Sequence, residues 1–295
     1  MAQIHLKDDS GYQAVFLPEE GMTLASFKKG DLEVIDPETK VLFEKRHGGL
    51  GPLIGPHFHE RPLARIPSVP ELENHPLYEL ARKTGRKDPF SHGMARYAKW
   101  EYESTETLIK GKLTGEMEFE GIPLKRIEGQ NFFLTFEARL SEKGLHIDYG
   151  VVSDTDSLVG FHYYFRLPNK QGTVISKVKE RALIEGEMHA IPEAFGYSDD
   201  HSLKFVLDKE ADYTFYPFLQ ETEANIQLET DEFLLDIVYQ CESQENAWQL
   251  WHPNHSTFVC IEPLSAKNPK KPILTASSLS LSLGIEDRKD LLPSK

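Results

Sequence analysis

The amino-acid sequence predicts an all-β protein, a large antiparallel β-sandwich with short helices confined to loops. In "NFFLTFEARL" the apolar residues of 132–140 alternate on one face, "SEKG" forms a turn, and "LHIDYGVVSD" returns, which predicts a hairpin. "NIQLETDEFLLDIVYQ" repeats this pattern with its turn at 230–232. Near the end, "SLSLSLG" alternates so regularly that Leu279, Leu281 and Leu283 are expected to face the core.

Helical patterns are weaker. The best of them is Glu71 to Arg82, "ELENHPLYELAR", in which Pro76 is expected to end or kink a helix. It lies in a stretch rich in Pro, His and Arg, residues 48–90, that predicts long loops around short elements, and loops of this length are often functional. No linker has the composition of a domain boundary, so residues 1–295 are predicted to form a single domain.

Composition and charge restrict the partners. The 295-residue chain has a net charge of −14, which argues against nucleic acid and anionic membrane, since both need a basic surface. The first ten residues do not resemble a signal peptide, and no apolar stretch reaches the length of a transmembrane helix. Cys241 and Cys260 lie in apolar, strand-like runs and fit a reducing compartment. The sequence therefore predicts a cytoplasmic protein and gives no indication of oligomeric state.

Two segments combine imidazole with guanidinium. "SHGMARYAKW" contains His92 and Arg96, which share a face if the segment is extended; the alternative is a loop histidine and a surface arginine. In "VGFHYYFRLP" the apolar face opposes a face formed by His162, Tyr164 and Arg166. That second face suits the wall of a ligand site, although a histidine on a strand is more often a hydrogen-bonded structural group.

A carboxylate ends the apolar run "TFVCIEPL". On a strand, Cys260 and Glu262 point one way and Val259 and Ile261 the other. Because an unpaired buried carboxylate is costly, Glu262 is either a strand end that reaches water or an acid placed in a site. Asp212 in "EADYTFYP" precedes another aromatic run, where a solvated strand start is the plain alternative.

Cofactor motifs are missing from the sequence. His57 and His59 in "PHFHERP" could meet on one strand face, but two imidazoles without a third ligand are a weak metal signal, so we predict no metal and a structural or cleft-edge role. There is no glycine loop for phosphate, no zinc-helix pair and no nucleophile elbow. The sequence therefore predicts no cofactor.

Taken in order, "HGMAR", "HYYF", the Asp of "EADYTF" and "FVCIEP" resemble the aldose 1-epimerase (galactose mutarotase-like) family. The resemblance extends over roughly Tyr12 to Gly284, and "AVFLPEEGMTLASFKKGDLEVID" looks like the family's first strands. The HGxxR form, with Trp251 ahead of "FVCIEP", is similar to the branch that includes hexose-6-phosphate 1-epimerases. Tyr163 departs from the pattern, since relatives often have proline or threonine there, and this leaves the shape of the sugar pocket open.

The resemblance implies a galactose mutarotase-like supersandwich and an isomerase that interconverts the α and β anomers of a hexose or hexose 6-phosphate without a cofactor. Carried over residue by residue, it makes Glu262 the base and His162 the acid of general acid–base catalysis. His92 and Arg96 would bind substrate oxygens and stabilise charge at the ring oxygen. Asp212 would accept hydrogen bonds from sugar hydroxyls.

The sequence leaves alternatives open for both the substrate and the activity. A phosphorylated sugar would need a fork of basic side chains, and the candidates are Arg61, Arg65, Arg96, Arg126 and Arg166. A carbohydrate-binding or sensing protein without catalysis could share the fold. A sugar lyase or hydrolase is the third alternative. Hydrolysis would need a pair of cleft carboxylates, and Glu262 is the only carboxylate whose surrounding sequence strongly supports such a position.

Overall fold

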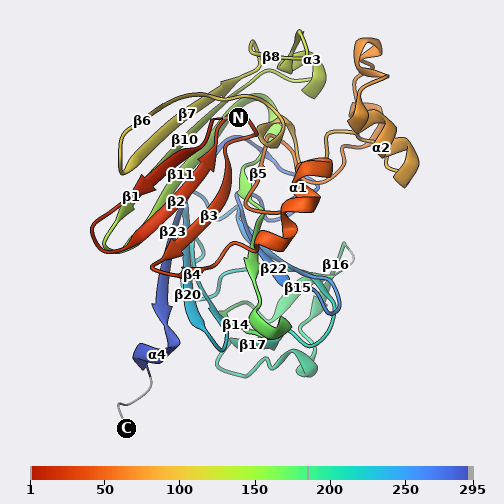
Figure 1. Cartoon of the computed structure of the whole chain (residues 1–295). Coiled ribbons are helices and arrows are strands. Elements are labelled where there is room, and N and C mark those ends of the chain that lie inside the picture. The colour runs from red at the N-terminus through yellow and green to blue at the C-terminus, as the bar shows by residue number, and fades with distance from the viewer. Residues whose placement is uncertain (1, 185, 292–295) are drawn as a thin grey trace.

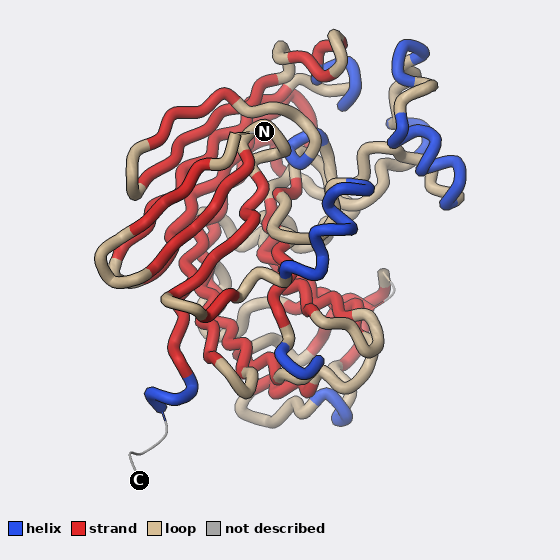
Figure 2. The backbone as a smooth tube through the Cα atoms, viewed as in Figure 1, coloured by secondary structure: helices blue, strands red, loops and turns tan. Residues whose placement is uncertain are grey.

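Strands dominate the computed structural model, which describes residues 2–184 and 186–291 (Figures 1 and 2). They form four antiparallel sheets, so the predicted all-β class is confirmed. The described helices are short, with the bounds α1 (Lys40–Arg46), α2 (Pro76–Thr84), α3 (Leu124–Glu128) and α4 (Arg288–Leu291). Single 3₁₀ turns lie at Pro37–Thr39, Leu63–Arg65, Pro70–Leu72, Met94–Arg96, Pro168–Lys170 and Glu193–Phe195.

The largest sheet has nine strands and contains both predicted hairpins. In β10 and β11, Ser141 pairs with Gly144 at the turn, and β19 pairs with β20 as the second hairpin. In spatial order its strands are β17 (Ser202–Val206), β14 (Thr173–Lys177), β19 (Glu223–Glu229), β20 (Phe233–Cys241), β23 (Leu274–Asp287), β11 (Gly144–Ser157), β10 (Phe132–Ser141), β7 (Leu108–Thr114) and β6 (Glu101–Ser104).

A second sheet of eight strands carries the candidate site. Its spatial order is β16 (Glu187–Ala190), β15 (Arg181–Ile184), β18 (Ala211–Phe215), β21 (Ala247–His252), β22 (Phe258–Leu264), β12 (Gly160–Phe161) and β5 (Leu53–Ile54), with β13 (Tyr163–Arg166) also paired to β22. The two smaller sheets consist of β1 (Ile4–Lys7), β2 (Tyr12–Leu17), β3 (Thr23–Lys29) and β4 (Leu32–Glu33), and of β8 (Glu118–Phe119) and β9 (Ile122–Pro123).

The sheets share one apolar core. Leu279, Leu281 and Leu283 of β23 are each 1% exposed, as the alternation predicts, and belong to the same buried cluster as Val259 and Ile261 of β22. One face of β22 therefore contributes to the core. Because side chains alternate along a strand, the other face of β22 is free to carry polar groups.

The long connection between β5 and β6 covers part of that second face and holds α2, which projects at the upper right of Figure 1. The sequence predicted a helix over Glu71–Arg82 that Pro76 ends or kinks, and the role of Pro76 was wrong: it is the first residue of α2, where its missing N–H costs no hydrogen bond. The Nδ1 of His75 caps this end by accepting from the Leu77 N–H. None of the helices in the described ranges is long and apolar enough to cross a membrane.

Candidate active site

A pocket of about 210 Å³ lies between the outer face of the eight-stranded sheet and the loops that cover it. The sheet contributes residues from four strands or their junctions, and the loops contribute basic and aromatic side chains. The sequence-predicted site residues His92, Arg96, His162, Asp212 and Glu262 all line this pocket. The remaining lining residues are Arg46, Gly48, Phe58, His59, Arg86, Ser91, Tyr97, Tyr164, Gln249 and Trp251.

His162 and Glu262 lie side by side at the base of the pocket. The register of β22 with β12 and β13, from Gly160–Leu264 to Tyr163–Ile261, places the two residues opposite each other. The Nε2 of His162 is 3.4 Å from the Oε1 of Glu262, and their side chains are only 8% and 2% exposed. The sheet therefore fixes an imidazole and a carboxyl group in contact and largely shields them from water.

Several groups hold the ring of His162. Its backbone N–H donates to the Pro52 carbonyl at 3.0 Å, so the chain stays anchored between β12 and β13. Tyr164 stacks on the ring at 5.0 Å with an angle of 9°, and His92 meets it edge-on at 5.1 Å. The Nδ1 atom of His162 has no hydrogen-bond partner among the described residues.

Burial shifts both members of the pair toward their neutral forms. It lowers the pKa of His162 well below its ordinary value, and the positive charges of Arg96 and Arg46 act in the same direction. Burial raises the pKa of Glu262 well above its ordinary value, although the charge of Arg96 opposes this. The neutral pair, imidazole with carboxylic acid, holds the same total number of protons as the charged pair, imidazolium with carboxylate. The two states differ only in which residue carries the transferable proton.

The HGMAR segment is a turn, not the extended strand that would place His92 and Arg96 on one face. His92 has a φ of 69°, and Met94–Arg96 form a 3₁₀ turn. Gly93 has a φ of 82°, and a Cβ there would lie 2.1 Å from the carbonyl oxygen of Gly55, so only glycine fits. The Nδ1 of His92 accepts the His59 N–H at 3.2 Å, which leaves Nε2 as the donor of the neutral ring.

Arg96 is a buried cation in the pocket wall, 4% exposed. Its Nε donates to the Leu53 carbonyl at 3.2 Å, while its Nη2 has no partner within the described part of the chain. A guanidinium left with unused donors is costly in the interior. This arrangement leaves a donor free to receive an oxygen atom of a ligand.

The opposite wall consists of strand residues. Asp212 of β18 is exposed and its Oδ1 accepts from the Nε2 of Gln249 on β21. Gln249 is the cross-strand neighbour of Glu262 and also accepts a hydrogen bond from Thr214. The sequence analysis missed Gln249. It lies in the strand-like run "AWQLWH", but only the pairing of that strand with the strand of Glu262 shows that Gln249 faces the pocket.

Only one of the five arginines that the sequence suggested lies in the pocket. Of the five candidates only Arg96 lines it, since Arg166 pairs with Glu232 and Arg126 pairs with Glu71. Arg61 lies in a separate buried cluster, and Arg65 borders a different hollow. Instead, Arg46 at the end of α1 and Arg86 just after α2 line the pocket.

His162, Cys260 and Glu262 form one group with metal-ligand atoms, all within 4.8 Å of one another. Burial raises the pKa of the Cys260 thiol well above its ordinary value, and a protonated thiol is a poor metal ligand. Cys260 and Cys241 are free, buried thiols, as predicted. His57 and His59, two positions apart in sequence, do not meet: His59 borders the pocket, and His57 contacts Glu128 outside it.

Comparison with known proteins rests on structure alone. No protein-family model matches the chain, and no curated protein matches it. A candidate aldose 1-epimerase from Escherichia coli matches with a TM-score of 0.69 at 12% identity, over 97% of this chain and 99% of that one. A galactose mutarotase-like protein from Lactobacillus casei matches with a TM-score of 0.67 at 14% identity, over 97% and 100%.

A third solved structure, of a homologue of GalM/aldose epimerase from Caenorhabditis elegans, has a TM-score of 0.66 at 13% identity and covers 96% of this chain and 98% of its own. Identities this low show a shared fold, and fold alone does not define an activity. The structural neighbours of this chain are thus aldose 1-epimerase and galactose mutarotase-like proteins, and the predicted galactose mutarotase-like sandwich is confirmed.

Proposed function

We propose that this protein is an aldose 1-epimerase, which interconverts the α and β anomers of a hexose or hexose 6-phosphate. The observation that supports this most strongly is the contact between His162 and Glu262 at 3.4 Å in a shielded pocket. Anomerisation needs one group that removes a proton and one that delivers a proton, in reach of the two oxygens bonded to C1 of the sugar.

The proposed reaction starts with the carboxylate of Glu262, which removes the proton from the anomeric O1 hydroxyl. His162 protonates the ring oxygen as the C1–O5 bond breaks, so the sugar opens to the free aldehyde. Rotation about C1–C2 presents the other face of the aldehyde, and the two residues reverse their roles as the ring closes. Every proton that leaves one residue reaches the other through the sugar, so no cofactor is needed.

Three further residues are proposed to bind the sugar. The free donor of Arg96 and the Nε2–H of His92 would contact the ring oxygen and its neighbours and stabilise negative charge that develops there. Asp212 would accept hydrogen bonds from hydroxyls at the opposite wall. These contacts would fix the ring so that O1 faces Glu262 and the ring oxygen faces His162.

A hexose 6-phosphate is the substrate that we favour, because Arg46 and Arg86 add positive charge to the pocket. The Arg46 side chain makes no hydrogen bond or ion pair among the described residues, and the Arg86 side chain has only a 3.9 Å approach to Glu60. Arginine forks bind phosphate oxygens in a bidentate manner. Two arginines that are not committed to other partners therefore support a dianionic ligand.

The test is to follow the equilibration of freshly dissolved α-glucose and α-glucose 6-phosphate by polarimetry and NMR exchange spectroscopy. We expect the protein to accelerate equilibration, and the phosphorylated sugar to have the higher kcat/KM. His162→Asn should lower the rate by about 10²–10⁴-fold, the usual contribution of one acid–base group. Binding of sugar by calorimetry without any acceleration would contradict the proposal and favour a carbohydrate-binding protein.

A further inference from the structure

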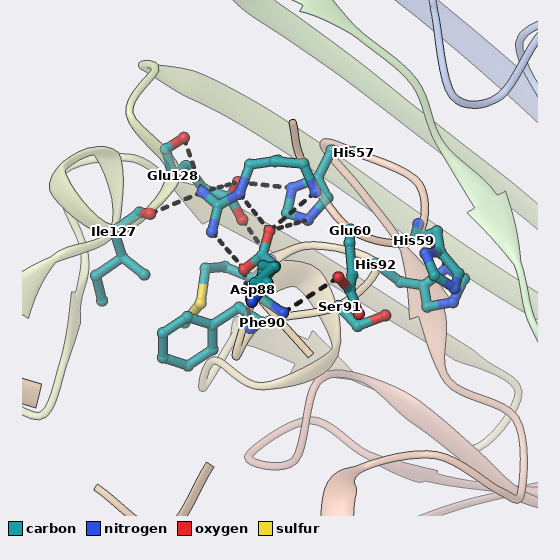
Figure 3. A network of polar contacts seen from close by, with 12 residues as sticks. His57, His59, Glu60, Asp88, Phe90, Ser91, His92, Ile127 and Glu128 are labelled. Atoms are coloured by element: carbon teal, nitrogen blue, oxygen red, sulfur yellow. Dashed lines mark hydrogen bonds and ion pairs between the residues drawn. The ribbon is translucent and has the colours of Figure 1, made fainter. Parts of the chain in front are cut away.

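Four charged or titratable side chains form a buried cluster next to the pocket, and no step proposed above uses them (Figure 3). They are His57, Arg61, Asp88 and Glu128, with side chains that are 12%, 7%, 0% and 0% exposed. Burying several charges costs free energy unless they are fully paired, and a hydrophobic replacement is often as stable. Stability alone therefore does not explain why this cluster is charged, which points to a functional role.

Arg61 connects the parts of the cluster. Its Nε and Nη2 donate to the two oxygens of Asp88 at 2.7 and 2.8 Å, a bidentate pair. Its Nη1 donates to the carbonyls of Ile127 and Glu128 at 2.8 and 2.9 Å, at the end of α3. Arg61 thus ties the loop at Asp88 to the helix that carries Glu128.

The two carboxylates hold the backbone that precedes and carries His92 and Arg96. Oδ1 of Asp88 accepts the Phe90 N–H at 3.1 Å. Oε1 of Glu128 accepts the Met94 N–H at 2.6 Å, while its Oε2 is 2.9 Å from the Nδ1 of His57. Met94 begins the 3₁₀ turn that ends at Arg96, so the bond from Glu128 lies between the two pocket residues in sequence.

Several further hydrogen bonds also hold this turn, among them one from the Gly93 N–H to the Phe90 carbonyl at 3.1 Å and one from the Trp100 Nε1–H to the Ala95 carbonyl at 2.9 Å. The His92 carbonyl accepts the Gly55 N–H at 2.9 Å, and the Ala95 N–H donates to the Gly55 carbonyl at 3.0 Å. The guanidinium of Arg96 has a single hydrogen bond, to Leu53, among the described residues. The direction of the Arg96 side chain therefore depends mainly on the backbone from which it starts.

We propose that Glu128 is a positioning residue for the pocket, which sets the turn of His92 and Arg96 through the Met94 amide. Arg61, Asp88 and His57 keep the Glu128 carboxylate aimed at that amide. For its effect on rate, this inference rests on the proposed anomerisation. A displacement of about 1 Å in a substrate-binding group can cost about 10²-fold in rate, so a small change in the turn has a large effect.

The experiment compares Glu128→Ala and Glu128→Gln with Glu71→Ala. Glu71 is a matched control because it pairs with Arg126 of the same helix, at 2.8 Å, but on the surface. We expect Glu128→Ala to lower kcat/KM by about 10–100-fold, Glu128→Gln by about 3–10-fold, and Glu71→Ala by less than about twofold.

A double-mutant cycle with Arg96→Ala separates positioning from general loss of structure. If Glu128 acts through Arg96, the Glu128 variants should cost little more in the Arg96→Ala background. A full additive loss would overturn the inference. Should Glu128→Ala fail to fold, the cycle with Glu128→Gln decides in the same way, and unchanged kcat/KM and Met94 exchange in Glu128→Gln would count against the inference.

Amide hydrogen exchange provides a readout that does not depend on activity. The Met94 amide should exchange at least about tenfold faster in Glu128→Ala, with an intermediate rate in Glu128→Gln and no change in Glu71→Ala. If the wild-type protein anomerises no sugar, the proposed function fails while this measurement still tests the positioning of the turn. Unchanged Met94 exchange in both Glu128 variants would refute the positioning role itself.

Discussion

Replacing Glu262 with glutamine should separate stability from activity in one variant. The wild-type carboxyl group is 2% exposed, and its Oε2 has no partner within the described residues. An unsatisfied buried polar group costs about 1–3 kcal/mol, and more when it is charged. We therefore expect Glu262→Gln to raise the free energy of unfolding at pH 8 by about 1–3 kcal/mol, because the glutamine never ionises.

The sign of the pH dependence follows from linkage. The folded-state pKa of Glu262 is raised by burial, so between the unfolded and folded pKa values the native protein binds more protons than the unfolded chain. Its contribution to stability is full below the unfolded pKa and is lost as the pH rises through the folded pKa. The stability difference between Glu262→Gln and wild type should thus be small near pH 4 and grow toward pH 8.

The assay is urea unfolding of both proteins from pH 4 to 8, together with anomerisation rates. Glu44→Gln, on the exposed side of α1, is the control and should change neither quantity. Activity of Glu262→Gln should fall by about 10²–10⁴-fold, the usual share of a general base. A stability difference that does not change with pH would refute the electrostatic reasoning, and turnover within tenfold of wild type would refute the assigned base.

Three further changes test other parts of the structure. Arg46→Ala and Arg86→Ala should each raise KM for glucose 6-phosphate by about tenfold or more, the loss of a charge-assisted hydrogen bond, in steady-state kinetics. Leu281→Ala should lower the free energy of unfolding by about 2–5 kcal/mol in urea, because Leu281 is 1% exposed. Gly93→Ala should destabilise by about 1–3 kcal/mol and lower kcat/KM, since its Cβ meets the Gly55 carbonyl.

Each of these changes has a control. The arginine variants should leave KM for glucose unchanged, and an equal loss with both sugars would argue against a phosphate site. Val152→Ala, at a side chain 60% exposed, should cost less than about 0.5 kcal/mol. Gly121 also has a positive φ of 76°, but a Cβ there meets nothing within 4 Å, so Gly121→Ala should leave activity intact.

Strand alternation made much of the fold readable from the sequence. A period of two places Leu279, Leu281 and Leu283 in the core, and it separates Val259 and Ile261 from Glu262 without any knowledge of neighbouring strands. Helix patterns failed at Pro76, because a proline inside an apolar pattern can begin a helix as well as break one. The bounds of short elements depend on such local choices.

The candidate site was readable only in part. Its five predicted residues meet in one pocket, and each lies in a motif that the resemblance made recognisable. Arg46, the last residue of α1, and Arg86, just after α2, lie outside any such motif, and they reach the pocket through the path of the chain around these two helices. The pKa shifts were also hidden, since they arise from burial by residues distant in sequence.

The state of the His162–Glu262 pair has a consequence for ligand binding. Catalysis as proposed needs an imidazolium and a carboxylate, whereas burial favours the neutral forms of both. A free hemiacetal stabilises the charged arrangement, because its O1 hydroxyl donates to the carboxylate and its ring oxygen accepts from the imidazolium. Sugar binding should therefore move a proton from Glu262 to His162 without taking one from solvent.

This reasoning predicts that the enthalpy of sugar binding at pH 7 is the same in buffers with different ionisation enthalpies, measured by titration calorimetry. A methyl glycoside has no O1 hydroxyl to donate to a carboxylate, so it cannot stabilise the charged arrangement and should bind at least about tenfold more weakly, the effect of one missing charge-assisted hydrogen bond. Buffer-dependent enthalpy would mean that the pair gains or loses a proton on binding, and the two residues could not then exchange one proton through the sugar.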